Sequence, residues 1–114
     1  SKLGEVLNEL GDVVSDTLIF CGLFGFSSSN KALVFAFIVL SVMNEFAGVM
    51  AKLISGTRRY DGPMGKSDRA LLIGAWCILY FVFPAVKNSF NPVIIIAILL
   101  LVLSTYKRIS NALN

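Results

Sequence analysis

Near the N-terminus, polar and acidic side chains form a row on one face of a helix. At about 100° per residue they fall within an arc of about 100°, and they are Glu5, Asn8, Glu9, Asp12 and Asp16. Converging carboxylates can bind a divalent cation, take a proton from a hydroxyl, or carry a proton themselves. For Glu5 and Glu9, an amphipathic entry to a membrane helix, solvated at the interface, is the alternative. We call this row the acidic stripe.

Two members of the acidic stripe lie beside apolar sequence. Asp12 and Asp16 precede the run 17–24, and an unpaired ionised carboxylate in a bilayer costs at least about 3 kcal/mol. Glu45 lies in a second apolar stretch, about two turns from its polar end, so we expect it to share a cavity with Asp16. Mg²⁺ or Mn²⁺ would offset the repulsion between these carboxylates because both ions prefer oxygen ligands. The alternative is a carboxyl group that stays protonated and carries protons.

The composition indicates a membrane protein. The 114 residues are 56% hydrophobic and 15% charged, with a mean hydropathy of +0.79, which is far more apolar than an ordinary soluble domain. Histidine is absent, which excludes imidazole bases and the commonest zinc ligand. The formal net charge of +3 is mostly a signal of membrane topology, and nucleic-acid binding has no support.

Four apolar segments can cross a membrane as helices. They span residues 10–26, 32–54, 70–86 and 92–106. Short polar turns follow the first and third segments, so we expect these to pair with antiparallel neighbours, whereas the connection 55–69 is longer and basic. The sequence therefore predicts an all-α polytopic membrane helix bundle of about four transmembrane helices, with residues 1–114 as a single transmembrane domain.

Lysine and arginine predict the orientation, because short cytoplasmic loops retain basic residues. With the N-terminus inside, eight basic residues lie on the cytoplasmic side, namely Lys2, Lys52, Arg58, Arg59, Lys66, Arg69, Lys107 and Arg108, and two lie outside, Lys31 and Lys87. Membrane lipids are therefore expected partners. The long basic loop is expected to face the cytoplasm.

The acidic stripe also resembles part of a known family signature. The spacing Gly4-x-x-x-Asn8-x-x-x-Asp12 is similar to the second half of the CDP-alcohol phosphatidyltransferase signature, Asp-Gly-x-x-Ala-Arg, eight residues, then Gly-x-x-x-Asp-x-x-x-Asp. Segments 44–48 and 58–70 are similar to one bacterial branch of that family. Members have six transmembrane helices, so the resemblance implies that this chain is the third to sixth, a fragment whose first half-signature lies upstream of Ser1. It also implies a bacterial inner membrane and an active site facing the cytoplasm.

The resemblance implies a reaction: a phosphatidyl group passes from a CDP-linked lipid to an alcohol acceptor, with Mg²⁺ or Mn²⁺ as cofactor and release of CMP. Asp12 matches the aspartate that serves as general base, and it is also a candidate metal ligand. Asn8 matches a metal-binding aspartate but lacks its charge, which Glu9 or Asp16 would supply. Gly4 would allow close approach of the nucleotide. Candidates to bind an acceptor phosphate or lipid headgroups are Arg58, Arg59, Lys66 and Arg69, with membrane anchoring as the alternative.

The sequence leaves other functions open. A small proton-coupled multidrug exporter has about four helices and one intramembrane carboxylate, but the several carboxylates and the basic loop fit it less well. A noncatalytic membrane subunit would use its polar groups for helix association. The acceptor alcohol is not identified, and a homodimer is left open.

Overall fold

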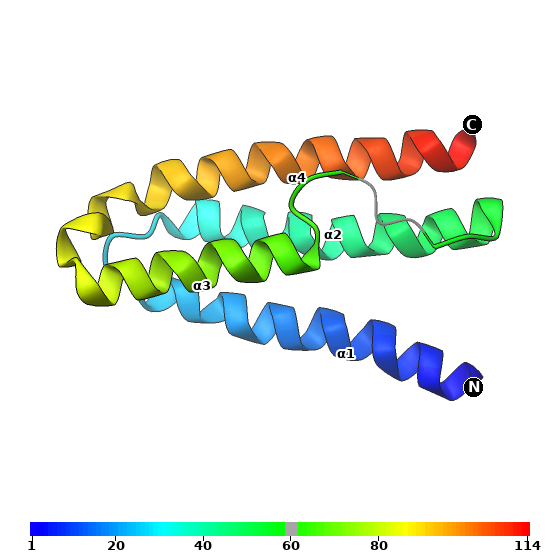
Figure 1. The fold of residues 1–114 in the computed structure, drawn as a ribbon, viewed down its shortest axis with the longest axis horizontal. Helices are drawn as coiled ribbons and strands as arrows, with labels where there is room; N and C mark the ends of the chain where they lie inside the picture. The colour runs from blue at the N-terminus through cyan, green and yellow to red at the C-terminus, as the bar shows by residue number, and fades with distance from the viewer. Residues whose placement is uncertain (59–61) are drawn as a thin grey trace.

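The structure, a computed structural model, describes residues 1–58 and 62–114. These residues form four α-helices and two short 3-10 helices (Figure 1): α1 (Lys2–Cys21), η1 (Gly22–Gly25), α2 (Lys31–Ser55), α3 (Lys66–Val82), η2 (Pro84–Ser89) and α4 (Phe90–Leu113). The predicted all-α bundle is confirmed, but some boundaries differ. The first helix begins at Lys2, before the apolar segment that starts at Leu10, so the acidic stripe lies on one helix as predicted. The Ser1 hydroxyl accepts a hydrogen bond from the Gly4 N–H at 3.0 Å and caps the helix.

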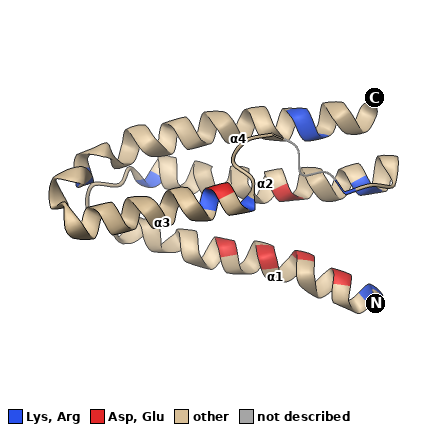
Figure 2. Ribbon diagram, in the orientation of Figure 1, with Lys and Arg blue, Asp and Glu red and all other residues tan. Residues whose placement is uncertain are grey.

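The helices alternate in direction, so that α2 and α4 run one way and α1 and α3 the other (Figure 1). Both short turns lie at one end of the bundle, which we call the turn end. The two termini and the connection between α2 and α3 lie at the opposite end, which we call the loop end. The predicted antiparallel direction of the helices on either side of each short turn is therefore confirmed (Figure 1). The acidic residues of α1 and most of the lysines and arginines lie toward the loop end (Figure 2).

Helices α2 and α4 form the most extensive helix contact in the described chain. Their buried positions recur every three or four residues, which gives each helix one continuous buried face. On α2 these residues are Val34, Phe37, Ser41, Asn44, Gly48 and Ala51, and on α4 they are Ile94, Ala97, Leu101, Ser104, Arg108 and Ala112. The contact is apolar toward the turn end and becomes polar toward the loop end. The packing of α2 on α4 therefore brings Asn44, Ser104 and Arg108 together.

An aromatic group closes the turn end. Trp76 of α3 stacks on Tyr80 and meets Phe90 edge-on, with ring centroids 5.4 and 4.9 Å apart. Its Nε1–H donates to Ser89 Oγ at 3.1 Å. These contacts fix α3 against the start of α4 and leave its other end to approach the polar part of the α2–α4 contact.

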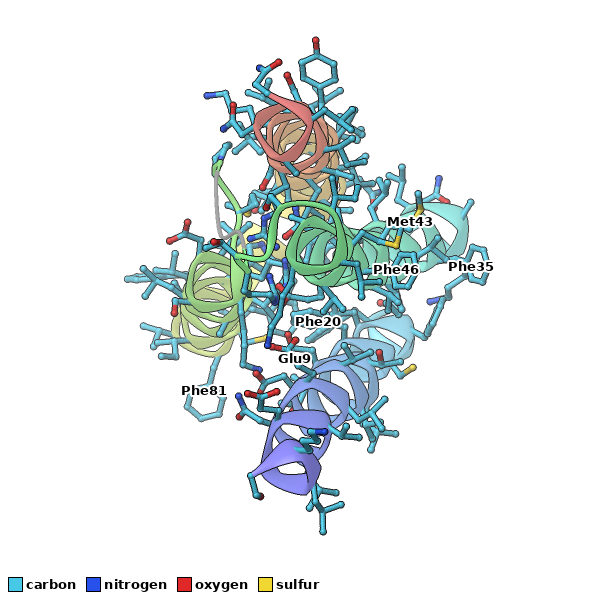
Figure 3. All side chains as sticks on the ribbon, turned by 90° about the vertical axis from the view of Figure 1, so that its right-hand side faces the viewer. Glu9, Phe20, Phe35, Met43, Phe46 and Phe81 are labelled. Carbon is cyan, nitrogen blue, oxygen red and sulfur yellow. The ribbon has the colours of Figure 1, made fainter. Side chains whose placement is uncertain are left out.

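The outer surface of the bundle is apolar. Phe35, Met43 and Phe46 point away from α2 on one side, and Phe81 points out from α3 (Figure 3); Phe81 is 86% exposed. In the described part of the chain, Lys31–Ser55 and Pro84–Leu113 are each long and apolar enough to cross a membrane. Helix α1 carries the acidic stripe, and α3 is shorter, at 17 residues. The two most hydrophobic helices thus pack on each other, with α4 at one edge of the bundle and α1 at the opposite edge (Figure 3).

The connection between α2 and α3 folds back along α4 (Figure 1). Gly62 has a φ of +88°, and a Cβ at this position would lie 2.6 Å from Ser104 Cα. Gly56, which ends α2, has a similar φ of +83° but open space around it. Glycine is therefore required at Gly62 for two reasons, backbone conformation and close approach to α4, and at Gly56 for the first alone.

These two glycines predict different costs for the same substitution. We expect Gly56→Ala to lower the free energy of unfolding by about 1 kcal/mol, the cost of a left-handed backbone. Gly62→Ala should cost about 1–3 kcal/mol more, because the loop must move off α4. Thermal unfolding of the two variants in detergent tests the difference, and equal shifts would show that the loop does not pack closely on Ser104.

Candidate functional site

The carboxylates of α1 and α2 converge as expected, and an arginine lies between them. Arg69 of α3 donates from Nη2 to Glu45 Oε1 at 2.8 Å, and the same nitrogen lies 3.5 Å from Asp16 Oδ2. The Arg69 side chain is completely buried, and Glu45 is 7% exposed. The prediction that Asp16 and Glu45 lie together is confirmed. The compensating cation is a guanidinium of the same chain.

Two more arginines surround Glu45. Arg58 donates from Nη2 to Glu45 Oε2 at 2.9 Å, while Arg108 Nη1 lies 3.8 Å from Glu45 Oε1. Asn44, the preceding residue, accepts from Arg69 Nη1 through its side-chain oxygen at 3.2 Å and from Arg108 Nη1 through its carbonyl at 2.8 Å. We call Asn44, Glu45, Arg58, Arg69 and Arg108 the arginine cluster. It joins α2, α3, α4 and the connecting loop around one buried carboxylate.

The remaining acidic stripe faces cations of the loop end. Glu9, which points from α1 into the bundle (Figure 3), accepts two hydrogen bonds from Arg58 at 3.2 and 3.3 Å. Asp16 Oδ1 accepts from Lys66 Nζ at 2.8 Å, whereas the nearest oxygen of Asp12 is 3.8 Å from that nitrogen. The Asp12 side chain is 42% exposed, against 13% for Asp16. Asp12 is therefore the more accessible of these two carboxylates and the more loosely paired.

A polar cavity of about 360 Å³ lies at the loop end of the bundle. Its wall is formed by Asn8, Glu9, Asp12, Glu45, Arg58, Gly65, Lys66, Ser67, Asp68 and Arg108. The predicted site residues Asn8, Glu9 and Asp12 of α1 thus share one cavity with the predicted cationic residues Arg58 and Lys66. Gly4, Asp16 and Arg69 are not part of this wall, and Arg59 lies outside the described residues.

The position of Arg69 corrects the expectation that it binds substrate. Its side chain is fully buried and bound to Glu45, Asn44 and the Met64 carbonyl. It compensates the charge of Glu45 and is not exposed on the cavity wall. Gly4, in turn, lies in the first turn of α1, so the expected approach of a nucleotide to its backbone has no counterpart in this cavity.

Arg108 is a site residue that sequence reasoning missed, because it was counted only as a basic residue at a membrane boundary. A signal was present in the spacing of α4. Residues Ile94, Ala97, Leu101 and Arg108 lie at helical intervals on one face, so the apolar periodicity of α4 includes Arg108 in the buried face. An arginine in that register had to point toward α2.

Arg58 is a permanent cation on the cavity wall. Partial burial lowers the pKa of its guanidinium, but the hydrogen bonds and charges of Glu9 and Glu45 outweigh this effect and raise the pKa above its ordinary value. The side chain therefore stays charged at any physiological pH. Its two carboxylate partners differ in exposure, at 35% for the Glu9 side chain and 9% for that of Glu45.

The described residues do not fit the expected magnesium or manganese site. They contain no group of three or more histidine, cysteine, aspartate or glutamate side chains that could hold a metal ion. Glu9 is bound by Arg58, and Asp16 by Lys66 and Arg69. Basic side chains of the loop and of α3 thus occupy the carboxylates that were expected to bind metal together with Asn8 and Asp12.

The apolar outer surface and the buried charges define a helical membrane protein. The chain is similar to "Inner membrane protein YnbA" of Escherichia coli (strain K12), with 36% identity over 113 residues. The match covers 99% of this chain and 56% of the relative, so the chain spans about half the length of the curated relative it matches. No protein-family model and no solved structure matches the chain.

The arginine cluster predicts a large cost for removing its central cation. Replacing Arg69 with methionine keeps much of the side-chain length but leaves Glu45 and Asn44 without their buried donor. We expect the free energy of unfolding to fall by about 3–5 kcal/mol, as for other broken buried ion pairs. Thermal unfolding in detergent measures this loss.

Lys52→Met is the matched control. Lys52 is 3.5 Å from Glu5, and both side chains are more than half exposed. Such surface pairs contribute at most about 1 kcal/mol. A comparable destabilisation in the two variants would contradict a special role for Arg69.

Proposed function

We propose that the chain is part of a phosphatidyltransferase of the bacterial inner membrane. The enzyme transfers a phosphatidyl group from a CDP-linked lipid to an alcohol and releases CMP. The observation that carries this proposal is the cavity of about 360 Å³, whose wall the accessible Asp12 shares with two cations, Arg58 and Lys66; Lys66 Nζ lies 3.8 Å from Asp12. The resemblance of Gly4-x-x-x-Asn8-x-x-x-Asp12 to the family signature supports the same reaction.

Three residues of the cavity have a chemical part in this reaction. The alcohol oxygen attacks the lipid-linked phosphorus, the bond from that phosphorus to the bridging oxygen breaks, and CMP leaves. Asp12 takes the proton of the attacking hydroxyl, for which its exposure and long contact with Lys66 suit it. Arg58 and Lys66 stabilise the negative charge of the phosphates.

Metal ions, which the resemblance implies, would neutralise the pyrophosphate and stabilise the leaving group. The described residues do not fit such a site, so we assign no step to a metal here. The Asp-Gly-x-x-Ala-Arg half of the signature is not among the 114 residues, and the matched relative is considerably longer than this chain. We propose that the missing ligands come from that half in the whole protein.

The residues that line the cavity lie toward the loop end, which carries most of the basic residues (Figure 2). The positive-inside rule therefore supports a cytoplasmic location, where a CDP-linked substrate is accessible. A proton-coupled exporter is less well supported. Proton transport needs an intramembrane carboxyl group that becomes neutral, and Asp16 and Glu45 are both held by cations.

The proposal predicts that Asp12→Asn abolishes catalysis in the full-length protein. We expect CMP release from CDP-diacylglycerol to fall by at least about 100-fold, the contribution of a general base. Release of radiolabelled CMP, measured in detergent with a panel of acceptor alcohols and Mg²⁺ or Mn²⁺, tests this expectation.

Glu5→Gln is the matched control, because Glu5 belongs to the same acidic stripe but does not line the cavity. Its pairing with Lys52 is exposed, and we expect CMP release within about twofold of the unmodified protein. Full activity of Asp12→Asn would remove Asp12 as the base. Absence of CMP release from the unmodified protein with every acceptor would overturn the proposed function.

A further inference from the structure

Two arginines of the cavity wall, Arg58 and Arg108, are bound by the neighbouring residues Asn44 and Glu45 of α2. Glu45 binds Arg58 at 2.9 Å, and the carbonyl of Asn44 binds Arg108 at 2.8 Å. Asn44 is fully buried and Glu45 nearly so. The guanidinium groups come from different elements, the connecting loop and α4, yet their positions depend on the same turn of α2.

This turn of α2 is itself fixed. Arg69 binds Glu45 Oε1 at 2.8 Å and Asn44 Oδ1 at 3.2 Å, and it reaches the Met64 carbonyl at 3.0 Å. The Asn44 amide donates to Ser104 Oγ at 2.9 Å. Both carboxylate oxygens of Glu45 and both side-chain polar atoms of Asn44 therefore have partners, so neither residue can turn without breaking a buried hydrogen bond.

We propose that Glu45 is a positioning residue of the cavity. It binds Arg58 directly and, together with the Asn44 carbonyl, holds the buried Arg108 in place, so that Arg58 is fixed where it receives a phosphate group of the ligand. This inference rests on the proposed function for the identity of the natural substrate. Arginine side chains lose much rotamer freedom when they bind an anion. A carboxylate that orders them beforehand removes part of that cost and increases affinity. Glu45 acts through the arginines and leaves the proton transfer to Asp12.

The substitution Glu45→Gln in the full-length protein tests this role, because glutamine keeps the size and one carbonyl oxygen but loses the charge. We expect the KM for CDP-diacylglycerol to rise about tenfold while kcat changes less than about threefold, since the ordering of the arginines affects binding more than proton transfer. Affinity for inorganic pyrophosphate, measured by calorimetry in detergent, should fall by a similar factor. Glu45→Asp keeps the charge but is shorter by one methylene, and we expect a pyrophosphate affinity loss of about threefold.

Ile94→Ala separates positioning from stability. Ile94 is completely buried in α4 toward the turn end, so this variant lowers the midpoint of thermal unfolding without touching the cavity. We expect it to retain the KM and the pyrophosphate affinity of the unmodified protein. A rise in KM and a loss of pyrophosphate affinity in Ile94→Ala that match those of Glu45→Gln would show that Glu45 only stabilises the fold and would overturn the proposal.

Pyrophosphate binding needs no turnover, so the two proposals can fail separately. If the unmodified protein binds pyrophosphate but releases no CMP, the phosphatidyltransferase function fails, and the affinities of the two Glu45 variants still decide the positioning role. If Glu45→Gln does not fold, Glu45→Asp decides it alone. Unchanged affinity in the folded variants, or no pyrophosphate binding by the unmodified protein, overturns the positioning role.

Discussion

The structure depends on the neutralisation of one buried carboxylate. Glu45 lies in the middle of a helix that is otherwise apolar enough to cross a membrane, where an uncompensated charge is costly. Arg58 and Arg69 bind its two oxygens, and Arg108 lies close to one of them. Each arginine belongs to a different element. The need to neutralise the Glu45 carboxylate therefore determines where the loop, α3 and α4 lie around α2.

The same constraint explains the short third helix. The chain leaves α2 at Gly56, folds back along α4, and starts α3 only at Lys66 (Figure 1). Arg69 then lies in the first turn of α3 at the depth of Glu45. A third helix as long as α2 would place its first turn at the loop end of the bundle, away from this carboxylate. Because α3 is shorter than α2, the connecting loop and the polar cavity occupy the space beyond its first turn. Burial of Glu45 and formation of the cavity are therefore linked.

Much of the fold could be predicted from local pattern. Four apolar segments and two short turns sufficed for the helix number and direction, and the depth of Asp16 and Glu45 sufficed to predict their proximity. The partners of the carboxylates could not be predicted, because they depend on how a long loop folds back in three dimensions. Arg69 was a candidate to bind a substrate, yet it is fully buried against Glu45, and Lys66 pairs with Asp16 while it also lines the cavity. Arg108 was overlooked because its meaning depends on the register of α4 against α2.

The charges around the cavity divide into fixed and exchangeable pairs. The Arg69–Glu45 pair is fixed because Arg69 is fully buried and Glu45 nearly so, and breaking it would leave the Arg69 charge without its buried partner. The Arg58–Glu9 pair is more exposed on its acidic side, and a phosphate can replace the carboxylate of Glu9 as a partner of Arg58 with little net loss of hydrogen bonding. Glu45 keeps its bond to Arg58 during such an exchange. In the function that we propose, an anionic ligand would meet an arginine that is already charged and already held on one side, which favours binding without rearrangement of the helices.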